Sequence, residues 1–135
     1  MIVYDGERIG RWVTEKAGGT WHAENTGIGI ECDGVLVAAI MYDGFTGSSI
    51  AMHSRVDDRK KISREWLRQI FDYPFNQLHV RRVSAIVSAA NQKAVLINQK
   101  LGWILETTLA DYFPEADGIV FIMRRENCRW LKGQK

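Results

Sequence analysis

The segment from residue 82 to residue 103 restricts the fold of this 135-residue chain more than any other segment does. An alternating apolar run at 83–88 predicts a strand, because neighbouring side chains of a strand point to opposite faces. Asn91 then precedes a helical segment at 92–101, and Gly102 stands where a helix commonly ends. A strand followed closely by a short helix is typical of folds in which helices cover a sheet.

Turn signals and hydrophobic periodicity divide the rest of the chain. Asp33-Gly34 between two apolar runs is a strong hairpin signal, and Ser63 is the expected N-cap of a helix that Pro74 ends. Further strands are predicted at 26–31, 35–42, 49–54, 103–112 and 119–124, and a further helix at 9–16. The sequence therefore predicts a mixed α/β fold, with a central, mixed and mostly antiparallel sheet of six to seven strands flanked by three to four helices.

Length and composition are those of a single globular domain covering residues 1–135. The apolar fraction is 46% and the charged fraction 25%, which are ordinary values for such a domain. A net charge of +2 is too small to indicate a nucleic-acid or membrane surface, so neither partner is expected. Cys32 and Cys128 lie in no metal-binding or disulfide pattern, so no metal site is expected. The N-terminus lacks a signal-peptide pattern, and a cytoplasmic location is expected.

With Asn91, Ala94 and the run 100–103 (Lys-Leu-Gly-Trp), the strand and helix resemble the second half of the acetyl-coenzyme A binding core of the GNAT N-acetyltransferases. The resemblance extends to the order of elements along nearly the whole chain. It implies an enzyme that transfers the acetyl group of acetyl-coenzyme A to an amine, which attacks the thioester directly in a ternary complex. The acceptor would be an amine-bearing small molecule, a protein N-terminus or a lysine side chain.

In the GNAT fold, two neighbouring strands splay apart, and their free backbone groups bind the pantetheine arm of the cofactor like an added strand. If 49–54 and 83–88 are these strands, Ala51, Met52 and His53 are expected along the arm. By resemblance, Asn91 takes the role of the asparagine that binds the pantetheine or phosphate part of the cofactor. An N-cap role alone would also explain Asn91.

The phosphate-binding segment departs from the family pattern. Most GNAT members carry a glycine-rich loop here, whereas the interval 55–64 contains no glycine. Arg59, Lys60 and Lys61 stand immediately before the expected helix start at Ser63, and these four residues are the candidates for holding the phosphates. The alternative is a charged surface loop, whose positive field the acidic residues at 57–58 partly offset.

A general base has to deprotonate the amine, directly or through water. His53, near the end of an expected strand, stands where family members often place a base, and histidine titrates in the useful range. Glu31, beside the predicted hairpin, is a second candidate, and Asp43 is a third. A structural role for a single histidine in a strand, or a solvated position for Glu31, remains the alternative.

This chain also differs from the family at the position of the general acid. Many members place a tyrosine in the helix just before Lys-Leu-Gly, and this position, which faces the cofactor in the family, is Asn98 here. An asparagine cannot donate a transferable proton. Tyr112 and Tyr73 are the candidates from elsewhere in the chain, and solvent could also protonate the departing thiolate.

The missing glycine loop and Asn98 favour a second interpretation, a non-catalytic GNAT-fold module that binds a partner or belongs to a virion. The runs 51–53, 73–78 and 126–131 are similar to those of small acetyltransferase-like proteins encoded by tailed bacteriophages, which would place the protein in the host cytoplasm.

Two further interpretations concern partners. A small nucleic-acid-binding domain is supported only by the basic residues at 55–64 and 81–82. A final strand carrying Phe121 and Ile122, if exposed at the sheet edge, would allow a homodimer.

Overall fold

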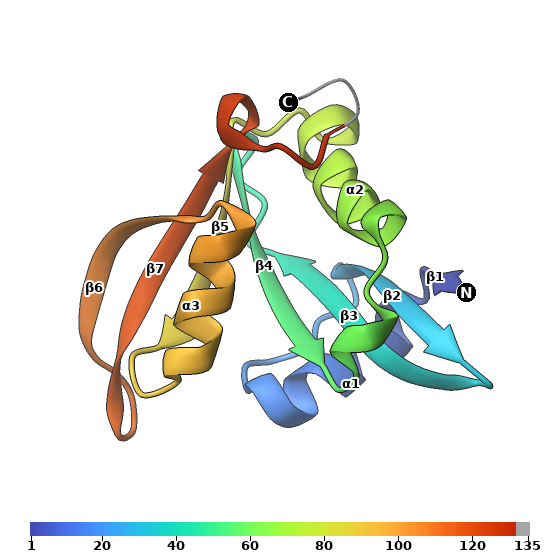
Figure 1. The fold of residues 1–135 in the computed structure, drawn as a ribbon, viewed down its shortest axis with the longest axis horizontal. Coiled ribbons are helices and arrows are strands. Elements are labelled where there is room, and N and C mark those ends of the chain that lie inside the picture. The colour runs from blue at the N-terminus through green and yellow to red at the C-terminus, as the bar shows by residue number, and fades with distance from the viewer. Residues whose placement is uncertain (132–135) are drawn as a thin grey trace.

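A computed structural model describes residues 1–131, which form one seven-stranded sheet with helices on both faces (Figure 1). The strands are β1 (Ile2–Val3), β2 (Thr26–Cys32), β3 (Val35–Asp43), β4 (Ser49–Val56), β5 (Arg82–Ser88), β6 (Ile104–Phe113) and β7 (Ala116–Arg124). They lie in the order β1-β2-β3-β4-β5-β7-β6, and every neighbouring pair is antiparallel except β4 and β5. The predicted mixed, mostly antiparallel sheet is therefore confirmed.

Each of the three α-helices begins at a side-chain cap, as local sequence rules require. The helices are α1 (Gly6–Ala17), α2 (Arg64–Asp72) and α3 (Gln92–Leu101), and the shorter helical turns are η1 (Arg59–Lys61), η2 (Tyr73–Gln77) and η3 (Arg125–Asn127). Asp5 caps α1, Ser63 caps α2 and Asn91 caps α3, each by accepting a backbone N–H of the first turn. Gly102 follows α3 with a left-handed backbone (φ 104°), which favours glycine.

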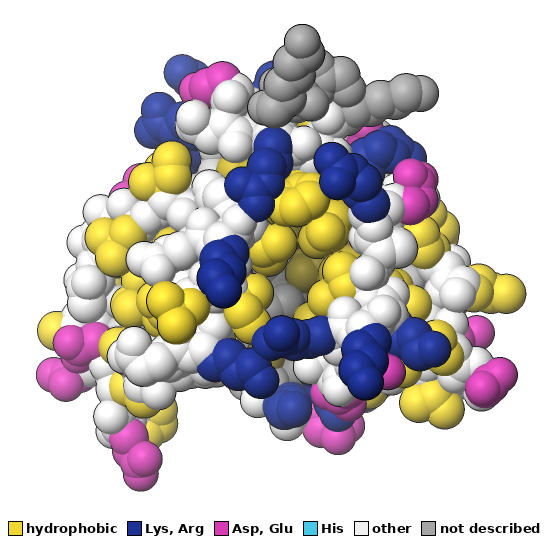
Figure 2. Space-filling model, in the orientation of Figure 1, with side chains coloured by type: hydrophobic (Ala, Val, Ile, Leu, Met, Phe, Trp, Pro, Cys, Tyr) yellow, Lys and Arg dark blue, Asp and Glu magenta, His cyan; other side chains and the backbone are white. Residues whose placement is uncertain are grey.

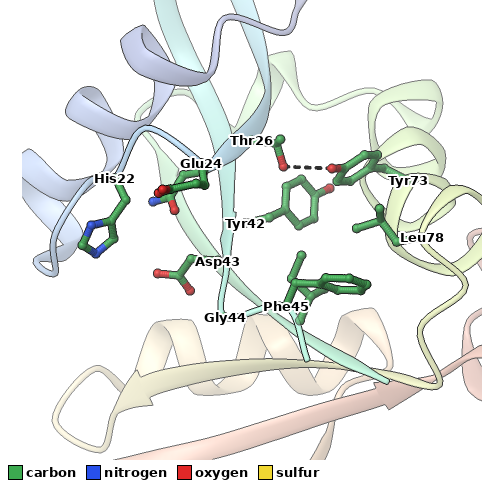
Figure 3. A pocket seen from close by; sticks show the side chains of 11 residues that line it. His22, Glu24, Thr26, Tyr42, Asp43, Gly44, Phe45, Tyr73 and Leu78 are labelled. Carbon is green, nitrogen blue, oxygen red and sulfur yellow. Dashed lines mark hydrogen bonds between the residues drawn. The ribbon is translucent and has the colours of Figure 1, made fainter. Parts of the chain in front are cut away.

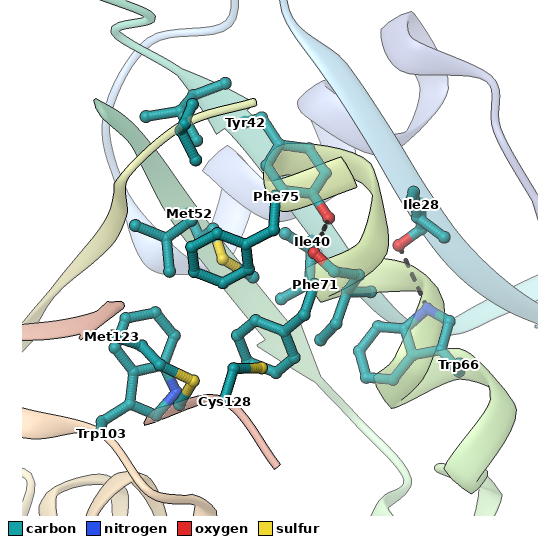
Figure 4. Packing of buried hydrophobic residues seen from close by; sticks show 14 of the residues in the cluster. Ile28, Ile40, Tyr42, Met52, Trp66, Phe71, Phe75, Trp103, Met123 and Cys128 are labelled. Carbon is teal, nitrogen blue, oxygen red and sulfur yellow. Dashed lines mark hydrogen bonds between the residues drawn. The ribbon is translucent and has the colours of Figure 1, made fainter. Parts of the chain in front are cut away.

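Two hydrophobic clusters lie on opposite faces of the sheet. The smaller lies between the sheet and α1. The larger contains the buried side chains of α2, and Figure 4 shows Trp66, Phe71 and Phe75 within it. Trp66 also donates its indole N–H to the carbonyl oxygen of Ile28 at 3.3 Å, which joins α2 to β2. Partly buried side chains of α3 pack against the same cluster, so α2 and α3 share one face of the sheet.

The predicted exposed final strand is wrong. β7 lies between β5 and β6, so the side chain of Phe121 is 0% exposed and that of Ile122 is 8% exposed. After β6 the chain reverses in a hairpin, and β7 lies between β5 and β6. β6 therefore forms one edge of the sheet. Its residues Ile104, Leu105 and Tyr112 are about half exposed, at 49%, 51% and 52%. A homodimer stays a prediction, and β6, the longer of the two edge strands, is available for it.

Candidate functional site

The parallel strands β4 and β5 are paired only at their beginnings. Three residues of each are in register, ending with Ala51 beside Ser84. Beyond this point β4 continues to Val56 paired with β3, and β5 continues to Ser88 paired with β7. Figure 1 shows the two strands diverging from their shared beginning. A gap therefore opens in the middle of the sheet immediately after Ala51.

Unpaired backbone groups of β4 face this gap. The amide of Asp57 donates to the carbonyl oxygen of Val37 on the β3 side at 2.8 Å, whereas the carbonyl oxygen of Ser48 accepts from the chain just before β5. Backbone groups of a strand alternate between its two sides, so odd-numbered residues of β4 pair with β3 and even-numbered residues face β5. The parallel pair of Ala51 and Ser84 uses the N–H of Met52, which donates to the carbonyl oxygen of Ser84. The C=O of Met52 and the N–H and C=O of Ser54 thus point into the gap.

The face of the molecule in front of β4 is hollowed. Figure 2 shows a hollow with an apolar floor, ringed by Lys and Arg side chains, and Figure 1 places it between α3 and α2. None of the α3 side chains is fully buried, although α2 buries three. The partly buried apolar side chains of the surrounding elements are Val56, Ile62, Leu67, Ala85, Val87, Val95, Leu101 and Trp130. Half-exposed apolar walls suit a ligand arm that would cover them.

Asn91 and Asn98 lie two helical turns apart on the same side of α3. The side-chain oxygen of Asn91 accepts the amide of Ala94 at 3.1 Å, so its N-cap role is present. Asn98 is half buried, and Val95, which lies between the two on this side, packs against the core. The predicted cofactor contacts of both asparagines stay predictions.

The basic residues Arg59–Lys61 form the exposed turn η1 at the end of β4. Asp57 does not offset their charge directly, because its carboxylate binds Arg55 at 2.9 Å and Lys16 at 3.7 Å. Its hydrogen bonds with Arg55, followed by the charges of Arg55 and Lys16, lower the pKa of Asp57 below its ordinary value. Asp58 caps η1 by accepting the amide of Lys60 at 3.1 Å. Within residues 1–131, no side chain of η1 forms an ion pair with a carboxylate.

The C-terminal segment joins the start of α2 to the end of α3. Trp130 donates its indole N–H to the carbonyl oxygen of Leu101 at 2.9 Å. The guanidinium of Arg129 lies 4.7 Å from its ring centroid and that of Arg64 lies 5.9 Å from it. Arg64 directly follows the cap Ser63. Sequence reasoning missed Arg64 and Arg129 as cofactor candidates, because only the tertiary fold brings them together.

His53 forms a pair with Asp43. Its Nε2 lies 2.8 Å from Oδ1 of Asp43, and both side chains are partly buried, at 35% and 29% exposure. An ionised carboxylate only accepts hydrogen bonds, so Nε2–H donates and Nδ1 keeps a lone pair that can take a proton. His53 lies two residues beyond Ala51, where the gap opens. The structure thus joins two of the predicted base candidates in one pair.

Glu31 lies at a different place from this pair. Its carboxylate forms an ion pair with Arg8 and is partly buried. In the β2–β3 ladder Glu31 stands opposite Leu36, near the hairpin, whereas His53 stands opposite Met41, near the far end of β3. The structure does not bring Glu31 and His53 together, and the ion pair supports a structural role for Glu31.

Tyr112 lies near the end of the edge strand β6. Its ring packs edge-on against Phe113 with centroids 5.0 Å apart. A Cβ added at Gly118 would stand 3.0 Å from the Cβ of Tyr112 and 3.1 Å from Ile86, so Tyr112 lies over the β5 and β7 arm of the sheet. This arm faces the gap from the side opposite β4, and a proton-donor role for Tyr112 stays a prediction.

A cavity of about 680 Å³ adjoins the site at the ends of β2 and β3 (Figure 3). Thr26 donates a hydrogen bond to the hydroxyl of Tyr73 at 3.1 Å, and Tyr42 donates to the carbonyl oxygen of Ile70 at 2.5 Å. Burial, and then the neighbouring Tyr73, raise the pKa of Tyr42 well above its ordinary value, which keeps its hydroxyl protonated. The cavity is lined by His22, Glu24, Asn25, Thr26, Tyr42, Asp43, Gly44, Phe45, Ile50, Tyr73 and Leu78.

Residues 1–131 give little support to metal-dependent or covalent catalysis. No group of three or more His, Cys, Asp or Glu side chains in this part is arranged to hold a metal ion. Burial raises the pKa of the Cys128 thiol, which disfavours the thiolate that a covalent mechanism needs. Of the helices in the described part, none has the length and apolar character needed to cross a membrane.

A mixed sheet whose central parallel strands splay apart, flanked by helices on both faces, is the GNAT N-acetyltransferase fold. Solved structures of low sequence identity share it. Spermidine/spermine N-acetyltransferase SpeG from Vibrio cholerae, with manganese ions, superimposes with a TM-score of 0.72 at 14% identity, over 92% of this chain and 91% of that one. The N-acetyltransferase PseH from Campylobacter jejuni, in complex with acetyl coenzyme A, gives 0.57 at 16% identity, over 77% and 70%.

A mutant form of SpeG gives a TM-score of 0.65 at 18% identity, over 76% of this chain and 66% of that one, so this chain spans slightly less than two thirds of it. No protein-family model matches the sequence, and no curated protein matches it. The predicted GNAT fold is confirmed by these structural neighbours.

Proposed function

We propose that this protein is an acetyl-coenzyme A dependent N-acetyltransferase in which the amine attacks the thioester directly in a ternary complex. The observation that carries the proposal is the gap between β4 and β5, with the pair of His53 and Asp43 at the point where it opens. The structural neighbours support it, because they are named N-acetyltransferases and one was solved with acetyl coenzyme A.

The residues around the gap fit acetyl-coenzyme A, which would supply an acetyl group already activated as a thioester. The C=O of Met52 and the N–H and C=O of Ser54 can pair with the amides of the pantetheine arm in the manner of an added strand. The half-exposed apolar side chains of the hollow can cover its methylene groups. The basic turn Arg59–Lys61 and Arg64, at the start of α2, can hold the anionic nucleotide end.

In the proposed reaction, His53 accepts at Nδ1 the proton that the amine loses as its C–N bond forms and the C–S bond of the thioester breaks. Asp43 holds the ring and stabilises the imidazolium that results. The free backbone amide of Ser54 can donate a hydrogen bond to the carbonyl oxygen, where negative charge develops. Asn98 cannot protonate the departing sulfur, so solvent or Tyr112 supplies that proton.

The rival function is a non-catalytic GNAT-fold module. It is favoured by the glycine-free segment 55–64 and by Asn98 in place of the helix tyrosine. The glycine-free segment concerns phosphate binding, and Asn98 concerns protonation of the departing thiolate. Neither feature closes the gap between β4 and β5. Binding of acetyl-coenzyme A without any acetyl transfer would support this rival.

Two measurements test the proposal. Acetyl-coenzyme A at one hundred times its dissociation constant should stabilise the protein by about 2.7 kcal/mol, seen as a raised unfolding temperature. In the presence of an amine panel, a thiol-reactive dye should then detect free coenzyme A, with acetyl-amine formed in equal amount. Absence of both signals would contradict the proposal.

Asn91 offers a test that separates capping from cofactor binding. In Asn91→Ser the hydroxyl still caps α3, so unfolding stability should change little, whereas Asn91→Ala should lose about 1 kcal/mol. If the carboxamide binds the cofactor, both variants should weaken acetyl-coenzyme A by about fivefold, the effect of one hydrogen bond. Unchanged affinity in Asn91→Ser would leave Asn91 with the N-cap role alone. Chemical unfolding and calorimetric titration give the two quantities.

A further inference from the structure

The cavity at the ends of β2 and β3 has the size and position of an acceptor site. Its volume of about 680 Å³ lies within the range typical of small-molecule sites. Ile50 in its wall immediately precedes Ala51, where β4 and β5 part. Asp43, also in its wall, holds His53. A molecule bound in this cavity would therefore lie next to the proposed base and the opening of the gap.

The formally charged side chains that line the cavity are both acidic. Figure 3 shows the carboxylates of Glu24 and Asp43 on the same side as His22, and the lining contains no Lys or Arg. Asp43 already binds His53, whereas Glu24 is exposed and forms no ion pair within residues 1–131. A positively charged ligand would be attracted here and an anion repelled.

Asn25 adds a hydrogen-bond acceptor that is accessible to a ligand. Its side chain lines the cavity and is only 9% exposed. The side-chain nitrogen donates to the sulfur of Met41 at 3.3 Å. The side-chain oxygen accepts no hydrogen bond from the part of the chain that the structure describes, and it is not fully buried, since Arg82 Nε is the one fully buried side-chain N or O atom there without a partner. An ammonium N–H could satisfy this oxygen.

The opposite wall is aromatic. Tyr42 and Tyr73 lie with their ring centroids 5.0 Å apart, and Figure 3 places them across the cavity from Glu24. Phe45, on the turn after β3, is 55% exposed and lines the same space. Aromatic faces bind apolar and aromatic groups well, and they also attract cations.

Resting on the proposed function, we infer that this cavity takes the acceptor, and that the acceptor is a small primary amine with one positive charge and an aromatic or other apolar body. The ammonium group lies against Glu24 and Asn25, and the apolar body lies against Tyr73 and Phe45. Loss of one proton to solvent leaves the neutral amine beside the opening of the gap, and His53 then accepts the second proton as the C–N bond forms.

Calorimetric titration of the full chain tests this inference without any acetyl transfer. The probes are 2-phenylethylamine, its neutral counterpart 2-phenylethanol, and spermidine, each with and without free coenzyme A to allow for ordered binding. We expect 2-phenylethylamine to bind at least about tenfold more tightly than 2-phenylethanol, because only the amine meets the carboxylates. Glu24→Lys should remove most of this preference.

Glu115→Lys is the matched control, since Glu115 is an exposed carboxylate on the distant turn between β6 and β7. It should leave amine binding unchanged. Equal binding of the amine and the alcohol, or tighter binding of spermidine, would overturn the inference, as would amine binding that Glu24→Lys leaves intact or no binding of any probe. Binding of acetyl-coenzyme A is measured separately, so failure of the proposed function is distinguishable from failure of the acceptor assignment.

Discussion

Replacing His53 with glutamine lowers the rate of acetyl transfer by about a hundredfold or more, the usual contribution of a general base. The substitution keeps a polar side chain of similar size in β4 but removes the group that takes the proton. The affinity for acetyl-coenzyme A should change little, because the backbone of β4, rather than the His53 side chain, faces the cofactor gap. Steady-state rates with a saturating amine, together with a calorimetric titration of acetyl-coenzyme A, separate the two effects.

Asp43→Asn should cause a smaller loss of rate, because the ring remains but its orientation and the charge that stabilises imidazolium are weakened. His79→Asn is the matched control. His79 lies in the loop before β5, with a positive φ of 57° that asparagine tolerates, and it should keep the full rate. A His53→Gln variant as fast as the parent would exclude His53 as the base. Glu31 would then be the next candidate to test.

Replacing Phe71 with alanine destabilises the fold by about 3–5 kcal/mol, the cost of emptying a large buried aromatic site. Phe71 lies in α2 with 1% of its side chain exposed, in the larger hydrophobic cluster. Its ring lies 5.9 Å from that of Trp103 at the end of α3, so the loss affects both elements. Urea unfolding followed by tryptophan fluorescence and circular dichroism gives the free-energy difference.

Phe45→Ala is the control for this prediction, because its side chain is 55% exposed. Its cost should stay below about 1 kcal/mol, as for most surface substitutions. Equal costs for Phe71→Ala and Phe45→Ala would contradict the packing of α2 against the sheet.

Local sequence signals predicted the elements well because each depends on nearby residues. The hairpin at Asp33-Gly34, the cap at Ser63 and the glycine stop at Gly102 all occur where turn and capping rules placed them. The overall fold class also followed from the order of these elements. The strand predicted at 119–124 exists, but its place in the sheet was wrong.

The failures concern contacts between distant segments. The interior position of β7 depends on which strand pairs with β5, and no local pattern encodes that choice. The partnership of His53 with Asp43 follows from the β3–β4 register, which the sequence leaves open. The approach of Arg64 to Trp130 joins residues that are 66 positions apart. In the structure, these tertiary contacts assemble the candidate site from residues that the sequence presents separately.

The central claim, that acetyl-coenzyme A lies in the gap between β4 and β5, is tested most directly by residue-resolved amide hydrogen exchange. With saturating acetyl-coenzyme A, exchange should slow at Ser54, whose amide faces the gap. It should change little at His53 and Arg55, whose amides already pair with β3. Unchanged exchange at Ser54, with acetyl-coenzyme A present in excess, would contradict the claim.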